Sequence, residues 1–317
     1  MRLFVILFIT CCLIVLSLSA SELDSLKLAL KSAEASGKPA ILIQIASLLQ
    51  KKEPDTALQY AIEAEQLAQA GGQLFETAAA RKLQGNFQYQ KKNYPAALKL
   101  YEAALGPART NALKAKRKAL GPEQSIADQK LLGDIYNNLG QTCLQLKDYP
   151  TALKHLQNSL QSRRSLPERE DEIASLHNLG LVYWEMQQFR KAAQYFKQAA
   201  HLLDNTNNVK LAATIWNNLG NAYSKIGETN EALDAYIRSL RLKEGFGAPQ
   251  ELAAAHVNLG NLFYLIKDYE KAIEHYTRAQ TLYRQIRDDM REAQIISNLG
   301  VVYNEIKDYP AAINNYK

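Results

Sequence analysis

Cysteine is scarce in this chain of 317 residues, with only three in total, and two of them, Cys11 and Cys12, lie in its first twenty residues. If that segment is removed, only Cys143 remains, and one thiol cannot form an internal disulfide. A disulfide framework is therefore excluded, and the fold must be held by the packing of its hydrophobic residues, which make up 47% of the chain.

Catalytic signatures are also missing. The sequence has no phosphate-binding P-loop, no Cys-x-x-Cys, no His-Glu-x-x-His and no Gly-x-Ser-x-Gly. The carboxylates stand in charged helix faces and linkers such as "PERED", where nothing would shift their acidity. We expect a protein that is not an enzyme and that holds no metal and no cofactor.

The positive charge, +6 overall, comes partly from the run "RTNALKAKRK" at residues 109–118. Runs of this kind can bind nucleic acid or anionic membranes, but no aromatic residues for base stacking are interleaved here. The run is interpreted as a solvated helix face, and no nucleic-acid partner is expected.

The N-terminus has the order of a secretory signal peptide. Arg2 precedes an uncharged apolar run over residues 3–16, and small and polar residues follow as far as Ser21, with cleavage expected after Ser19 or Ala20. The run is short for a bilayer-spanning helix. The alternative is an uncleaved anchor, so in either case we expect export, to the periplasm in a bacterium, and membrane contact only through this segment or through sequence beyond Lys317.

The remainder of the chain repeats itself. The tripeptide Asn-Leu-Gly recurs at a fixed step of 40 residues, and a period of this size indicates a solenoid of stacked units. The repeat glycines are Gly140, Gly180, Gly220, Gly260 and Gly300. Large residues stand sixteen positions after each glycine, namely Leu156, Phe196, Tyr236, Tyr276 and Tyr316. Small residues stand twelve positions after it, namely Ala152, Ala192, Ala232, Ala272 and Ala312.

Each unit reads as two amphipathic helices. Apolar residues before and after Gly140 step by three and four, which places them on one face of a helix. The turn "KDYP" follows, where Asp148 can cap the second helix and Pro150 can lie in its first turn. Glycine and alanine would let the helices approach closely while the rings fill the space between hairpins.

These residues resemble the tetratricopeptide repeat family, whose pattern is Leu-Gly followed by an aromatic residue and then by Ala, an aromatic residue and Ala in the second helix. The resemblance implies an all-α fold, a right-handed α-solenoid of helix-turn-helix hairpins. With its 40-residue step the chain is similar to kinesin light chain, Pins-type adaptors and bacterial sensor proteins. We assign residues 1–20 to the signal, 21–70 to a degenerate first hairpin, 71–105 to a second hairpin, and 126–317 to five more, the last truncated.

Residues 106–125 interrupt the register. From Gly85 to Gly140 the step is 55 residues, and the text "ALGP" occurs twice, at 104–107 and at 119–122. We expect an inserted short helix between two Gly-Pro breaks, lying on the surface or offsetting the solenoid at that point.

A ladder of asparagines is the candidate binding site. In the family the position two before each glycine faces a concave groove that takes peptides, and amides there can pair with a peptide backbone. These residues are Asn138, Asn178, Asn218, Asn258 and Asn298, with Asn221 and Asn261 one position after a glycine. The alternative is that the amides only fix the stacking of neighbouring repeats. Trp184 and Tyr264 could likewise be groove anchors or interface core, and the ladder offers no Lys or Arg clamp for a C-terminal carboxylate.

We therefore predict an exported scaffold that binds a protein or an extended peptide in its groove. Because the chain stops within a helix at "AAINNYK", we expect a fragment of a longer protein, and the resemblance suggests the sensor part of a bacterial signalling protein. The alternative is an assembly platform that docks subunits on its convex face or open end without a groove ligand.

Overall fold

The computed structural model describes residues 22–118, 122–203 and 207–316. The predicted signal segment, residues 1–20, lies outside the described residues. Within the described ranges no helix combines the length and the apolar character needed to cross a bilayer.

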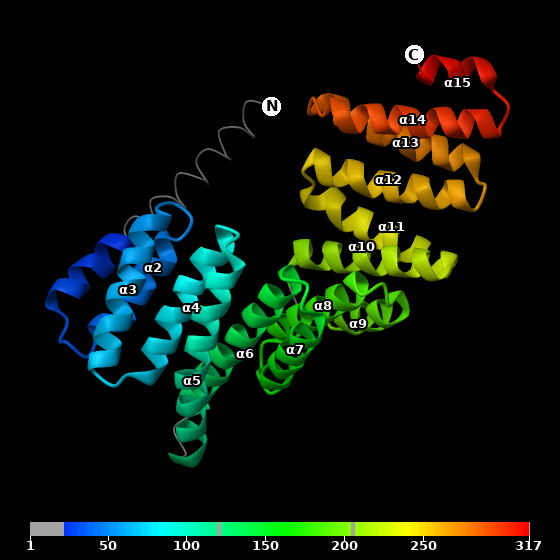
Figure 1. Ribbon diagram of the computed structural model, residues 1–317. Helices are drawn as coiled ribbons and strands as arrows, with labels where there is room; N and C mark the ends of the chain where they lie inside the picture. Colours follow the sequence, from blue (N-terminus) through cyan, green and yellow to red (C-terminus); the bar gives the residue numbers. More distant parts are fainter. Residues whose placement is uncertain (1–21, 119–121, 204–206, 317) are drawn as a thin grey trace. The chain divides into compact units, whose positions relative to one another are not determined.

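The chain divides into two units, residues 1–167 and residues 168–317. In the first, a helix at residues 22–32 precedes three antiparallel hairpins, α2 with α3, α4 with α5 and α6 with α7 (Figure 1). Their bounds are α2 Lys38–Leu49, α3 Pro54–Ala70, α4 Leu74–Gln90, α5 Tyr94–Lys118, α6 Pro122–Gln145 and α7 Tyr149–Arg163.

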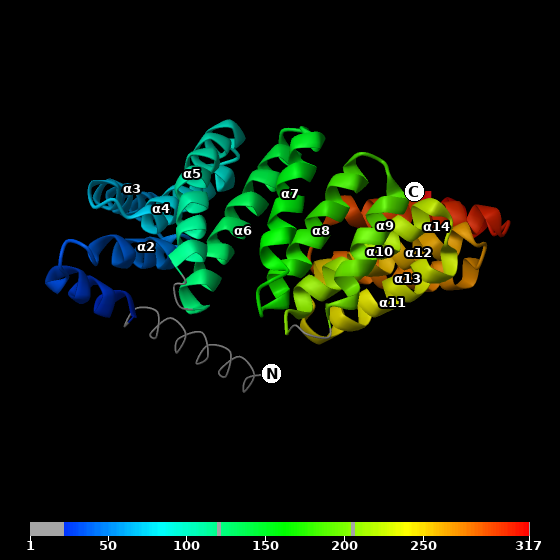
Figure 2. The ribbon, with the colours of Figure 1, turned by 90° about the horizontal axis from the view of Figure 1, so that it is seen from below.

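The second unit holds four more hairpins, and within it α10, α12 and α14 follow one another as a stack (Figure 1, Figure 2). The bounds are α8 Arg169–Glu185, α9 Phe189–His201, α10 Val209–Ile226, α11 Thr229–Phe246, α12 Pro249–Leu265, α13 Tyr269–Gln285, α14 Asp289–Glu305 and α15 Tyr309–Tyr316. Even-numbered helices are the first helices of their hairpins, and odd-numbered helices are the second.

The turns inside the hairpins use the residues that the sequence predicts. Asp148 accepts a hydrogen bond from the backbone N–H of Thr151 at 3.2 Å, and Pro150 lies in the first turn of α7, so both predictions for this turn are confirmed. The residue seven after each repeat glycine ends the first helix in the left-handed region, for example Lys147 with φ 62° and Gly227 with φ 81°. This left-handed residue reverses the chain and starts the second helix.

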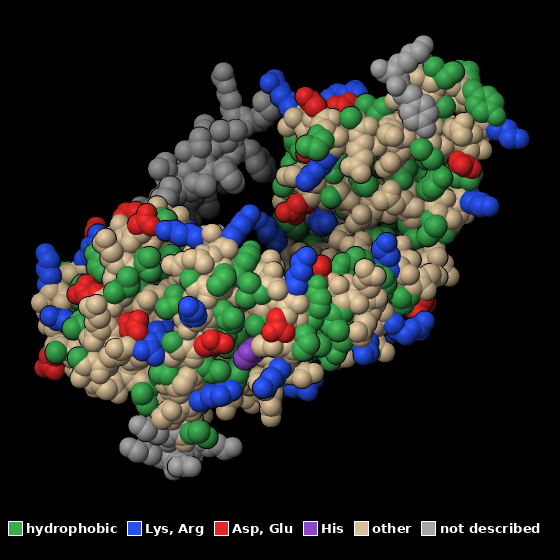
Figure 3. Space-filling model, in the orientation of Figure 1, with side chains coloured by type: hydrophobic (Ala, Val, Ile, Leu, Met, Phe, Trp, Pro, Cys, Tyr) green, Lys and Arg blue, Asp and Glu red, His purple; other side chains and the backbone are tan. Residues whose placement is uncertain are grey.

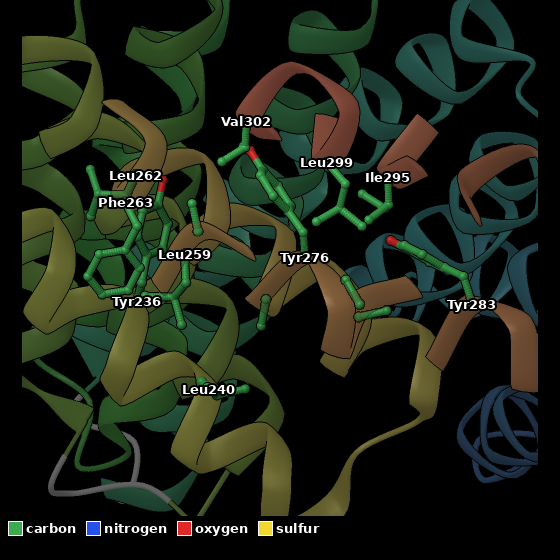
Figure 4. Packing of buried hydrophobic residues seen from close by; sticks show 14 of the residues in the cluster. Tyr236, Leu240, Leu259, Leu262, Phe263, Tyr276, Tyr283, Ile295, Leu299 and Val302 are labelled. Carbon is green, nitrogen blue, oxygen red and sulfur yellow. The ribbon is translucent and has the colours of Figure 1, made fainter. Parts of the chain in front are cut away.

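In the repeats of Gly140, Gly180, Gly220 and Gly260, the glycine is the point where the two helices of the hairpin come into contact. A Cβ added at Gly220 would lie 2.6 Å from Cδ1 of Tyr236, and one at Gly260 would lie 2.7 Å from Cδ1 of Tyr276. The ring sixteen residues on therefore packs directly on the bare glycine backbone, as the alternation of small and large residues predicts. Figure 4 shows Tyr236 and Tyr276 within the buried cluster that α11 to α14 form.

This contact makes the glycines hard to replace. Gly220→Ala should lower the free energy of unfolding by about 1–3 kcal/mol, because the methyl group would overlap a ring that cannot move away. The matched control is Gly245→Ala in α11, where nothing lies within 4 Å of the added Cβ. That change should stabilise the helix by up to about 1 kcal/mol. Urea unfolding measures both, and equal effects of the two variants would contradict the packing assignment.

The structure differs from the prediction at residues 106–125. α5 runs without interruption through Gly106 and Pro107 to Lys118, and α6 begins at Pro122, so the extra residues lengthen two existing helices. The predicted break at Gly106-Pro107 is therefore wrong. Pro107 has no N–H to offer the carbonyl of Ala103, but Arg81 donates to that oxygen from Nη1 at 2.8 Å and so supplies the missing bond.

The basic run is partly used for packing. The guanidinium of Arg109 lies over the Tyr136 ring and donates from Nε to the Tyr136 hydroxyl at 2.7 Å. Elsewhere, on the face of the molecule seen in Figure 3, Lys and Arg side chains are interspersed with Asp and Glu. The first cation of the run thus joins α5 to α6 while its side chain remains exposed.

Candidate functional site

A cavity of ≈ 450 Å³ opens between the first helices of the second unit. α8 contributes one ring, α10 and α12 contribute amides and apolar side chains, and α11 contributes the edge of a tyrosine. The lining residues are Trp184, Asn221, Ser224, Lys225, Tyr236, Asn258, Asn261, Leu262, Tyr264 and Leu265. Its size is within the range of ordinary ligand pockets.

The asparagines two before the glycines join successive first helices. Nδ2 of Asn258 donates to Oδ1 of Asn217 at 2.9 Å, and Asn138 makes the same kind of bond with Asn86 in the first unit. Nδ2 of Asn218 lies 2.9 Å from Nε2 of His177. These bonds match the alternative in which the amides fix the stacking of the repeats.

The asparagines one after the glycines have a different structural partner. Oδ1 of Asn221 accepts a hydrogen bond from the Tyr236 hydroxyl at 2.8 Å, and Oδ1 of Asn261 accepts one from the Tyr276 hydroxyl at 2.7 Å. Burial raises the pKa of both phenols to about 12, so they stay protonated as donors at neutral pH. Each bond ties the first helix of a hairpin to its second.

Each of these amides has a second polar group that the bond does not use. The bond of Asn258 engages its Nδ2, which leaves the carbonyl Oδ1 outside that bond. The bonds of Asn221 and Asn261 engage Oδ1 and leave the Nδ2 donors outside them. The cavity wall therefore combines amide acceptors and donors, which are the groups that pair with a peptide backbone.

Two aromatic residues line the cavity and also pack within their own hairpins. Trp184 contacts Phe189 edge to face, with ring centroids 5.0 Å apart, and Tyr264 lies 6.0 Å from Tyr269 by the same measure. Both rings are half-buried by these contacts inside their hairpins, and both line the cavity. Leu265 beside them is 60% exposed.

Three of the seven predicted site residues line the cavity, and the other four lie elsewhere. Asn221, Asn258 and Asn261 line the cavity together. Asn138 belongs to the first unit, Asn178 is only 6% exposed, and Asn218 and Asn298 are half-buried on α10 and α14 outside the cavity lining. Sequence reasoning missed Lys225 and Leu265, although both stand five after a repeat glycine, on the turn of the helix that follows the asparagines.

The histidines occupy packing positions. His155 and His275, which share one repeat position, are half-buried and pack against Tyr136 and Phe263, with centroids 6.0 and 5.4 Å apart. Among the described residues no group of three or more His, Cys, Asp or Glu side chains is arranged to hold a metal ion.

Several solved structures share this fold at low sequence identity. PilF of Pseudomonas aeruginosa aligns with a TM-score of 0.58 at 18% identity and covers 79% of this chain and 94% of its own. Aspartyl phosphate phosphatase F from Bacillus subtilis gives 0.58 at 14% identity, over 91% of this chain and 72% of its own.

A third structure is a signal transduction ATPase with a tetratricopeptide repeat sensor, from Pyrococcus horikoshii. It gives a TM-score of 0.60 at 16% identity, over 88% of this chain and 48% of its own. No match was found among curated proteins.

Family models decide the classification. Tetratricopeptide repeat models match residues 131–204, 213–246 and 251–317, together more than half of the chain. The matches agree with the all-α solenoid of hairpins and with the glycine-to-ring packing described above. The chain belongs to the tetratricopeptide repeat family, and it is a scaffold for interactions with proteins.

Proposed function

We propose that the second unit binds an extended peptide segment of a partner protein in the cavity between α8, α10 and α12. The observation that carries this proposal is the lining of that cavity, where asparagine amides stand beside Trp184, Tyr264 and the exposed Leu265. Protein recognition sites typically combine apolar anchors with a few well-placed polar groups.

The amides suit the backbone of a peptide more than any one side chain. Oδ1 of Asn258 can accept from a peptide N–H, and Nδ2 of Asn221 and of Asn261 can donate to peptide carbonyls, while the opposite end of each amide is held by the protein. Because these bonds orient the amides before binding, little side-chain entropy is lost when a peptide arrives. Leu265 and the two rings then supply the contact with an apolar side chain.

The setting we propose for this scaffold is outside the cytoplasm, within a longer bacterial signalling protein. Support comes from the order of residues 1–21, which is that of a signal peptide, and from the likeness in fold to a protein whose repeats are described as a sensor. Sequencing the gene past the codon for Lys317 tests the second part. A membrane span followed by a kinase, cyclase or DNA-binding domain is expected, and a stop after a capping helix would overturn it.

Groove binding is tested by selecting a displayed library of random linear peptides on the whole chain and measuring the enriched peptides by calorimetry. We expect at least about a tenfold loss of affinity in Leu265→Ser, which removes the exposed apolar contact of the cavity. The matched control is Met290→Ser, because Met290 is an apolar residue that is 83% exposed and lies outside the cavity.

Two results would contradict the proposal that this cavity binds a peptide. One is a library from which no linear peptide is enriched, and the other is an enriched peptide whose affinity falls equally in Leu265→Ser and Met290→Ser. Both substitutions are on exposed side chains, so unchanged urea unfolding should accompany them.

A further inference from the structure

A second cavity, of ≈ 390 Å³, is separate from the cavity between α8, α10 and α12. It is lined by the second helices α9 and α11 and by α10. Its floor is apolar and aromatic, and its rim is polar. The lining residues are Lys197, Ala200 and His201 from α9, Trp216, Leu219 and Tyr223 from α10, and Asn230, Glu231, Asp234 and Ala235 from α11.

Two other repeats of the second unit, those of Gly180 and Gly260, fill this position with a ring. The ring three after the glycine stacks on a ring fifteen after it, in the second helix of the same hairpin. Tyr183 and Tyr195 stack with centroids 5.3 Å apart and an interplanar angle of 10°. Phe263 and His275 do so at 5.4 Å and 12°. The position fifteen after the glycine is thus one where this fold holds a planar ring in a nearly parallel stack.

In the hairpin of α10 and α11 the second ring is missing. Tyr223 stands three after Gly220, but Ala235 stands fifteen after it, so a methyl group occupies the place of the ring. The neighbouring second helix has the same kind of change, because Ala200 in α9 stands where α11 has the buried Leu240. Two alanines in place of larger side chains account for the cavity.

The remaining side chains shape the site. The guanidinium of Arg238 covers the Trp216 ring at 4.8 Å from its centroid and is itself bonded to Asp234 from Nε at 2.8 Å. These contacts hold the indole in place at one end of the floor. The ionisable groups facing the cavity are Lys197 and His201 on the α9 wall and Glu231 and Asp234 on the α11 wall.

An apolar, aromatic floor inside a rim that carries charges of both signs is the arrangement of an interface hot-spot pocket. Because the rim carries both signs of charge, it does not favour a cationic over an anionic ligand. In the neighbouring repeats a planar ring occupies the equivalent position, so the floor fits a planar ring. We propose that this cavity binds an aromatic side chain of a partner protein, which stacks on Tyr223 as Tyr195 stacks on Tyr183 and His275 on Phe263.

The proposal is tested on the whole chain by nuclear magnetic resonance of the indole N–H of Trp216, which is told apart from that of Trp184 by the variant Trp184→Phe. N-acetyl-tyrosinamide is the probe, because it carries a side chain in a peptide setting, and N-acetyl-leucinamide is the aliphatic comparison. The expected result is a saturable shift with a Kd on the order of 1 mM for the tyrosine probe, and binding at least about fivefold weaker for the leucine probe.

The variant Ala235→His places in the cavity the side chain that the next repeat has at this position. It should weaken binding of the tyrosine probe at least about tenfold and should not lower the melting temperature, because the new ring fills space that is now open. Met290→Ser, on an exposed residue outside the cavity, should leave the shift unchanged.

Three outcomes would overturn the proposal. The first is an equal response to the leucine probe, and the second is an unchanged affinity in Ala235→His. The third is binding of free p-cresol that is much tighter than binding of the tyrosine probe, which would assign the cavity to a small aromatic molecule rather than to a partner protein. Loss of groove binding in Leu265→Ser does not bear on any of these, so the two sites are tested separately.

Discussion

Replacing Tyr276 with alanine is expected to lower the free energy of unfolding by about 3–5 kcal/mol, the range for removing a large buried ring. The side chain is only 3% exposed, and it packs on the bare backbone of Gly260. Figure 4 shows the ring beside Leu299 and Val302 of α14, so it also joins its own hairpin to the next. Its loss would leave a cavity at the junction of two hairpins, where neighbouring helices cannot close the gap by a local shift.

A conservative variant separates the ring from its hydroxyl. Tyr276→Phe keeps the packing and removes only the hydrogen bond to Oδ1 of Asn261, so it should cost about 1 kcal/mol. Arg278→Ala, on an exposed residue of the same helix, should change stability by less than about 0.5 kcal/mol. Urea melts of the three variants make the comparison. If Tyr276→Ala lowers the free energy of unfolding by less than about 1 kcal/mol, the ring contributes little to the packing between hairpins.

The core residues could be predicted from sequence periodicity because the same pair of small and large positions recurs in successive repeats. The glycine and the large residue sixteen positions on recur in register, and the structure places them in direct contact at Gly180 with Phe196 as well as at Gly220 with Tyr236. The helix cap in the turn could also be predicted, since capping depends on residues three apart in sequence.

Contacts between residues that are far apart in the sequence could not be predicted from the repeat pattern. The continuation of α5 through Pro107 rests on Arg81, more than twenty residues away, and no local rule predicts that bond. The hydrogen bond that holds Asn261 could not be predicted either, because the Tyr276 hydroxyl reaches it only through tertiary packing. Ala235, by contrast, could have been noticed, since Tyr195 and His275 stand at the same repeat position.

Acid is expected to destabilise the second unit well above the pH at which its carboxylates are protonated. Burial lowers the pKa of His177 to about 4, and burial together with His275 and Arg278 lowers that of His256 to about 4 against the opposing effect of Glu274. An unfolded histidine has a pKa of about 6.5, so between about pH 6.5 and pH 4 the unfolded chain binds more protons than the folded chain. Stability is therefore complete above about pH 6.5 and falls as the pH decreases through this window.

For His177 the loss amounts to about 2 kcal/mol at about pH 5 and about 3 kcal/mol once the pH is below 4. The hydrogen-bond geometry acts in the same direction as burial, because Nε2 of His177 lies 2.9 Å from Nδ2 of Asn218 and a proton on that nitrogen would oppose the amide donor. His177→Gln keeps a side chain that can accept from Asn218 but cannot titrate in this range. Urea unfolding from about pH 7 to pH 4 should give a flatter pH dependence in His177→Gln than in the unsubstituted chain. Equal slopes in the two proteins would show that this histidine is not held neutral by the fold.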